Sequence, residues 1–395
     1  MRISTSLAFQ RATSAMTEQQ SQLSKTEMQM ATGLKHLTAA DDPPAAARIL
    51  GLNQAIGSVT QYQENIERLS SRLEYEEAAV DNTVNILQRI NELAIAGNNG
   101  NLLPSDTQAI ASELHQLLDE MMGVGNTQNS NGEYIFAGFQ SDTPPFSRPA
   151  IDTFAYSGDQ GQRSLQISAG RQVADGDNGF DMFVNVDTGP FATVTEVAAT
   201  TFGALNDGDL TINGIGLGYI PPAADADERA SQIFDAVNAI EDITHVQALM
   251  DSSSTLTFTS SAGDIDIYAA SLADTGLTTA VETATTEKRS ILESVYQLAD
   301  ALDNNDAVDR YINDIQLALE HITMRQTTIG GRLNAVFGQS EVNASVKLIY
   351  EADLSSERDL DYTEAIGRFN QQTLALQAAQ QAFVKIQGLS LFNYI

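Results

Sequence analysis

The sequence predicts an α+β protein in which long N- and C-terminal helices form coiled-coil and helical-bundle layers that enclose a β-rich central insert. Three observations favour this fold. Apolar residues repeat every seventh position near both ends, glycine and proline crowd the stretch from Gly123 to Pro222, and the middle of the chain is acidic. With 395 residues, 42% of them apolar, the chain is long enough to bury real cores.

The first and last segments of the chain carry apolar residues at heptad spacing. In the first segment these are Phe9, Met16, Leu23, Met30 and Leu37. In the last they are Tyr362, Phe369, Leu376 and Phe383, with Ile366 and Ile386 beside them. A helix with one apolar stripe needs a partner, so we expect the two helices to pair with each other.

Pairing with each other would make these two helices only marginally stable. Ordering ~40 residues costs roughly 40 to 80 kcal/mol of backbone entropy, and about seven buried side chains return only about 10 to 20 kcal/mol. Neighbouring subunits can supply the missing burial, so we predict that the stripe residues, Leu37 excepted, form an assembly interface. The predicted interface is Phe9, Met16, Leu23, Met30, Tyr362, Ile366, Phe369, Leu376, Phe383 and Ile386.

The next segment predicts a rod-like helix. Its heptad positions are Leu52, Val59, Ile66, Leu73, Val80, Leu87 and Ala94. Asp41 and Asp42 supply an acidic N-cap, Pro43 and Pro44 suit the first turn, and Gly97 begins a C-cap. At ~1.5 Å per residue the helix would be about 80 Å long.

Two further helical segments follow the same pattern. One begins after Pro104 and ends between Gly123 and Gly125. The other shows alternating steps of four and three from Val308 to Val336, broken only at Gln326. Its apolar positions are Val308, Ile312, Ile315, Leu319, Ile322, Ile329, Leu333 and Val336. We interpret the stripes within residues 46–122 and 287–337 as the core of an intramolecular bundle.

Between the helices, residues 133–137 after Asn131-Gly132 give a hairpin-like strand signal. Beyond them we expect a small α+β insert within residues 203–270, with strands at 210–212 and 255–258, a turn at Asn213-Gly214 and a helix at 228–240. The nesting predicts three layers. They are residues 1–44 with 340–395, residues 45–140 with 283–339, and an outer domain at 141–282.

Charge and cysteine content exclude several kinds of partner and site. The chain has 52 acidic and 21 basic residues, and no lysine lies between Lys35 and Lys288, so nucleic acid and anionic membranes are poor partners. Without cysteine, neither disulfides nor thiolate metal sites can form. No run approaches ~18 apolar residues, and Met1–Thr5 lacks the apolar core of a signal peptide, so we expect no membrane insertion and export by another route.

Four separated motifs resemble the flagellin family, and within it the junction proteins between hook and filament. These motifs are Met1–Thr5, Ala31–Lys35 followed by Ala40–Pro43, Asn131–Gly138 with Pro145–Ser147, and the tail Gln387–Phe392. They lie in about 140 residues at the start and 110 at the end of the chain. The stretch 209–267 resembles an insert motif of flagellins and hook proteins.

The resemblance implies a structural subunit of the bacterial flagellum rather than an enzyme. Such proteins polymerise in a helical tube whose inner layer is the terminal helices, and they are exported unfolded by the flagellar type III apparatus. It implies as partners further copies of the chain, the hook-side junction protein, flagellin and an export chaperone that holds the C-terminal helix. The protein would then be secreted and located at the hook-filament junction.

The alternatives are a flagellin of the filament itself, a secreted adhesin that binds through the insert, and a secreted hydrolase. Flagellins usually end in an arginine-terminated leucine pair, which this chain lacks. The four histidines are scattered singly, residues 175–181 lack the ligand order and closing glutamate of an EF-hand, and the glycines at 214–218 precede no helix N-terminus. We therefore predict no catalytic, metal or cofactor site.

Overall fold

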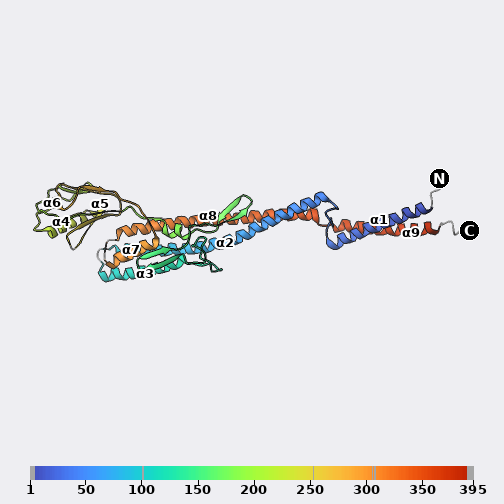
Figure 1. The fold of residues 1–395 in the computed structure, drawn as a ribbon, viewed down its shortest axis with the longest axis horizontal. Coiled ribbons are helices and arrows are strands. Elements are labelled where there is room, and N and C mark those ends of the chain that lie inside the picture. Colours follow the sequence, from blue (N-terminus) through green and yellow to red (C-terminus); the bar gives the residue numbers. More distant parts are fainter. Residues whose placement is uncertain (1–4, 100–101, 252, 305, 307, 389–395) are drawn as a thin grey trace. The chain divides into compact units, whose positions relative to one another are not determined.

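The computed structural model describes residues 5–99, 102–251, 253–304, 306 and 308–388. Its helices are α1 (Thr5–Thr32), α2 (Pro43–Gly97), α3 (Pro104–Gly125), α4 (Ala226–Asn238), α5 (Glu241–Thr244), α6 (Leu272–Thr275), α7 (Ile291–Asn304), α8 (Asp309–Arg358) and α9 (Tyr362–Gly388). The chain divides into two compact units. One contains residues 1–66, 166–171 and 337–395, and the other contains residues 67–165 and 172–336. The α+β class and the long terminal helices are confirmed (Figure 1).

The predicted helices form where the heptads place them. Of the two acidic residues predicted to cap α2, Asp42 does so: its Oδ1 accepts a hydrogen bond of 3.0 Å from the amide of Ala45. α3 ends at Gly125, and α8 continues well past the predicted heptad to Arg358. One helix is shorter than predicted: α1 ends at Thr32, where Gly33 adopts a φ of +72° that favours glycine, so Leu37 lies beyond the helix.

The heptads of the second unit are core, as predicted. In α2 the fully buried apolar side chains include Leu69, Leu73, Val80, Leu87 and Ile90. In α8 they include Ile315, Ile322, Ile329 and Val336. α7 precedes α8 as a separate helix and lies beside α3 (Figure 1).

The strand predicted at residues 133–137 is wrong. These residues form turns, and Tyr134 pairs with Gln128 only as an isolated bridge. The side chains of Ile135, Phe136 and Ala137 are nevertheless buried. The apolar run reflects packing rather than a strand: the ring of Phe183 meets that of Phe136 edge-on, with centroids 5.2 Å apart.

Thirteen short strands are described between the helical segments, in five small sheets. They are β1 (Phe146–Ala150), β2 (Thr153–Tyr156), β3 (Ser164–Ser168), β4 (Arg171–Ala174), β5 (Val186–Asp187), β6 (Ala192–Thr195), β7 (Leu210–Ile212), β8 (Ile215–Gly216), β9 (Val246–Met250), β10 (Leu256–Ser260), β11 (Ile265–Ala269), β12 (Ala280–Glu282) and β13 (Lys288–Arg289). A π-helical turn, η1, spans Phe180–Val184.

The insert predicted within residues 203–270 has its own core. β6-β10-β9 form one antiparallel sheet and β12-β11-β7-β8 another, and α4 packs against β9. The turn at Asn213-Gly214 has φ angles of +50° and +76°, as a two-residue hairpin requires. The buried core side chains lie between Ala192 and Leu277, so this core is self-contained.

A short neck joins the insert to the helices. β5 pairs with β13, and Phe191 pairs with Thr285 through two backbone hydrogen bonds of 3.1 and 3.0 Å. The buried carboxylate of Asp314 on α8 accepts the amide of Gly189 at 2.8 Å and a guanidinium N–H of Arg289 at 3.1 Å. Burial raises the pKa of Asp314, and these two donors oppose that rise.

Candidate assembly surface

The N- and C-terminal helices lie side by side, as the sequence analysis predicted (Figure 1). Two backbone hydrogen bonds join the chain just after α1 to the chain just before α9. The amide of Lys35 donates to the carbonyl of Arg358 at 2.8 Å, and the amide of Leu360 donates to the carbonyl of Gly33 at 2.9 Å. The Tyr362 hydroxyl then donates to the carbonyl of Met30 at 3.1 Å. α1 and α9 are therefore held in one register.

The predicted interface residues are only partly covered by this pairing. The rings of Phe9 and Phe383 meet with centroids 5.0 Å apart. Half-buried side chains are Met16, Leu23, Met30, Phe369, Leu376 and Phe383, whereas Phe9, Tyr362 and Ile366 are exposed. The side chain of Ile386 lies outside the described part of the chain. The helix pair thus buries part of each stripe and leaves the rest open.

A second set of exposed apolar side chains lies outside the heptad positions of α8 and α9 and was not predicted from the sequence. Leu374 is 68% exposed and Val384 is 64% exposed, both on α9. On the C-terminal part of α8, Val342, Leu348 and Ile349 are also exposed. A helix that is apolar on more than one face is normally buried on more than one face. The signal was present as apolar residues outside the main register of α9.

Ion pairs at the base of the helix pair involve exposed groups. Lys25 contacts Asp41 at 2.6 Å, and this hydrogen bond lowers the pKa of Asp41 to about 2. Arg48 of α2 makes a bidentate pair with Glu357 of α8, with both distances 3.0 Å. Such exposed pairs add orientation more than stability.

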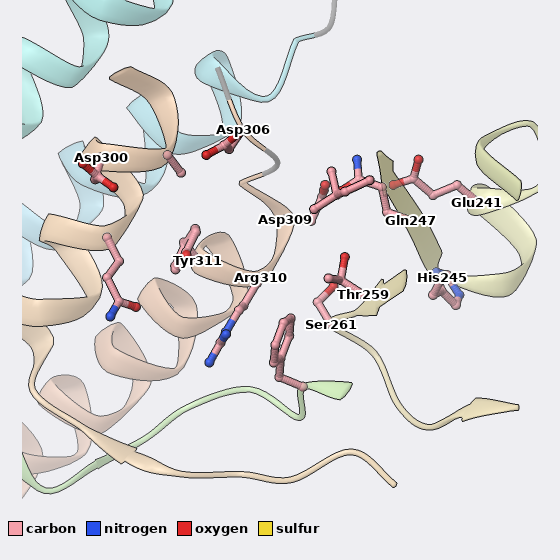
Figure 2. Close-up of a pocket in the computed structure, with 14 residues that line it drawn as sticks. Glu241, His245, Gln247, Thr259, Ser261, Asp300, Asp306, Asp309, Arg310 and Tyr311 are labelled. Carbon is pink, nitrogen blue, oxygen red and sulfur yellow. The ribbon is translucent and has the colours of Figure 1, made fainter. Parts of the chain in front are cut away.

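A cavity of about 300 Å³ lies where the insert faces α7 and α8 (Figure 2). Glu241, His245 and Gln247 line it from the insert, and Asp309 and Arg310 line it from α8. The Arg310 guanidinium lies 3.6 Å from the centre of the Phe191 ring, which also borders the cavity. Burial, followed by the nearby Asp309 and Asp242 carboxylates, raises the pKa of Glu241.

The histidines and the acidic stretch singled out in the sequence contact other protein groups rather than forming a site. Nε2 of His321 lies 2.9 Å from the carbonyl oxygen of Asp181, and that of His115 lies 3.2 Å from a carboxylate oxygen of Asp303. Asp175 and Asp177, in the stretch weighed as a calcium loop, are buried and face arginines. Within the described ranges, no three His, Asp or Glu side chains gather as a metal site would require. None of the described helices has the length and apolar content to cross a membrane.

Comparisons with known proteins agree with this architecture. Residues 3–141 match the model of the bacterial flagellin N-terminal helical region. Flagellar hook-associated protein 3 of Escherichia coli is 24% identical over 393 residues, covering 100% of this chain and 99% of that protein. A flagellin of Salmonella derby is 31% identical, but over only 31% of this chain and 24% of its own length. The crystal structure of hook-associated protein 3 from Legionella pneumophila aligns with a TM-score of 0.57 and 22% identity, covering 78% of this chain and 98% of that one.

Proposed function

We propose that this chain, which is homologous along its full length to flagellar hook-associated protein 3, is a structural subunit that polymerises at the junction between hook and filament. The end-to-end match carries the proposal, because it includes the insert as well as both terminal helices. Flagellin relatives match less than a third of the chain, which favours a junction protein over a filament subunit.

The terminal helix pair supports a polymerising role. Its exposed apolar side chains, with Leu374 at 68% and Val384 at 64%, give each subunit surface that a second copy can bury. A net charge of −31 keeps separate chains apart, so a specific apolar contact must supply the attraction between them. We assign the predicted interface residues to this contact.

The proposal extends to partners and location. In addition to its own copies, the subunit would contact the hook-side junction protein on one side and flagellin on the other. Before assembly, a flagellar export chaperone would cover the C-terminal helix, and the type III apparatus would export the chain. The homology supports these partners, and the exposed stripe of α9 offers a surface that a chaperone could cover.

Two other functions predict different behaviour. An adhesin would act through the insert as a monomer, and a hydrolase would need a nucleophile beside a base. The relatives matched over their full length carry a flagellar name, which favours a structural role over both. The acidic cavity at the base of the insert supplies carboxylates and Arg310, but its position beside the neck suits a joint between insert and helices.

Genetic complementation with two forms of the chain tests the proposal. One form is complete, and in the other a tight turn replaces residues 192–284. Phe191 and Thr285 already pair across the neck, so closing the chain there costs little, and the deletion removes the self-contained insert core. We expect cells lacking the gene to bear hooks without filaments and to shed flagellin, and both forms to restore attached filaments.

The outcomes separate the alternatives. If cells without the gene keep their filaments, the junction role is wrong. If only the complete chain restores attachment although the shortened chain is exported, the insert is part of the joint. Loss of adhesion with normal swimming would instead identify an adhesin.

A further inference from the structure

A cluster of charged side chains, buried around Glu76 and Asp177 and partly exposed at Glu133 and Arg163, lies where α2 and α8 meet the turn before η1. Four carboxylates, Glu76, Glu133, Asp175 and Asp177, face three guanidinium groups, those of Arg72, Arg163 and Arg332. With every group ionised, the cluster would carry one negative charge in excess. Burying an unmatched charge is expensive, so the identity of the unmatched group matters.

The ion pairs identify that group. Arg72 lies 3.1 Å from Glu133 and 3.4 Å from Asp175. Arg163 lies 3.4 Å from the same Asp175 oxygen. Arg332 lies 2.9 Å from Asp177. In these ion pairs each arginine meets a carboxylate other than Glu76.

Glu76 instead forms a hydrogen bond with the backbone of the turn at residues 175–178. Its Oε1 accepts a hydrogen bond of 2.8 Å from the backbone amide of Asp177. Its Oε2 and the Oδ2 of Asp177 are both buried, and neither has a hydrogen-bond partner among the described residues. Glu76 is 2% exposed and Asp177 is 5% exposed, so both carboxyl groups are shielded from bulk solvent. Burial and the nearby second charge both disfavour ionising two neighbouring carboxyl groups, so one of them keeps a proton more readily than an isolated carboxyl group would.

We propose that the Glu76–Asp177 pair binds one proton at neutral pH, and that this proton latches the turn at residues 175–178 onto α2. The charges around the pair come from every element that packs there. Arg72 lies on α2, Arg332 lies on α8, and Asp175 and Arg163 come from the loop region. Neither Glu76 nor Asp177 has a part in the proposed assembly surface.

The direction of the pH effect follows from the burial. Burial first, and the Asp177 charge second, raise the pKa of Glu76 to about 8, while the Asp177 amide, Arg332 and Arg72 lower it by less. The unfolded chain releases this proton near the ordinary glutamate pKa. The stabilisation is therefore complete below that ordinary value and is lost as pH rises through about 8.

Glu76→Gln tests the latch, because a side-chain amide stays uncharged at every pH. Its oxygen can still accept the hydrogen bond from the Asp177 backbone amide. Thermal and denaturant unfolding of the full chain would be measured from about pH 6 to about pH 9. The unfolding equilibrium constant of the unaltered chain should rise at least roughly tenfold more than that of Glu76→Gln, since one pKa unit corresponds to a tenfold change. Hydrogen exchange of the Asp177 amide should rise in parallel.

Matched variants keep the test decisive. Glu74→Gln alters an exposed glutamate on the same helix and should keep the pH dependence of the unaltered chain. Asp177→Asn removes the neighbouring charge and should reduce that dependence, but by less than Glu76→Gln does, because burial still raises the pKa of Glu76. An unchanged pH slope in Glu76→Gln would overturn the latch. So would a calcium- or sodium-dependent rise in melting temperature that disappears in Glu76→Gln, because the pair would then bind a metal cation.

Discussion

Leu374→Asp is expected to abolish assembly while leaving the isolated subunit almost as stable as before. In one subunit the Leu374 side chain is 68% exposed, so a charge there remains hydrated and changes the free energy of unfolding by only about 0.5 kcal/mol. Between subunits the same carboxylate would lose its water without gaining a partner, at a cost of several kcal/mol. Because every copy repeats the contact, the junction should fail to form.

The measurements are filament attachment in cells that export the variant and thermal melting of the purified chain. Leu374→Met is the matched control, since a swap that conserves volume and apolarity should keep assembly. Phe369→Asp, chosen from the heptad alone, should also block assembly, but its half-buried position should loosen the α1–α9 pair as well. Normal attachment by Leu374→Asp would show that this face of α9 is not an interface.

Phe183→Ala should have the opposite signature, a large loss of stability in the isolated subunit. The Phe183 side chain is 1% exposed, and its ring meets those of Phe136 and Phe146 edge-on at 5.2 and 5.5 Å. Removing a buried phenylalanine leaves a cavity and typically costs about 3 to 5 kcal/mol. The midpoint of denaturant unfolding should therefore fall steeply.

Phe139→Ala is the control in the same region, because Phe139 is 60% exposed and its removal should cost far less. Equal losses in the two variants would mean that the aromatic cluster does not form. Read together with Leu374→Asp, this pair separates residues that stabilise the subunit from residues that join subunits.

The sequence predicted the helices well because their signal is long and repeated. The heptads of α2 and α8 continue over many turns, and burial of Leu73 and Ile322 follows directly from them. The hairpin strand at residues 133–137 failed for the opposite reason. Four apolar and aromatic residues, Tyr134 to Ala137, fit a strand after Asn131-Gly132, but their partners include Phe183, which is distant in the sequence.

The buried charges show a second limit. The partners of the acidic stretch at residues 175–181 could not be deduced from the sequence. Arg72 and Arg332 lie more than a hundred residues away on different helices, and no local pattern joins them to Asp175 or Asp177. The open face of α9 was missed because one apolar register was taken to be the whole of its surface.

Electron microscopy of flagella with an antibody or tag on this chain tests the central claim most directly. A tag placed in the insert, for instance at the exposed Gly214, would leave the terminal helices free to assemble. A junction subunit should give label confined to a short zone between hook and filament. Label along the whole filament would identify a flagellin, and label on the cell surface away from flagella would contradict the junction role altogether.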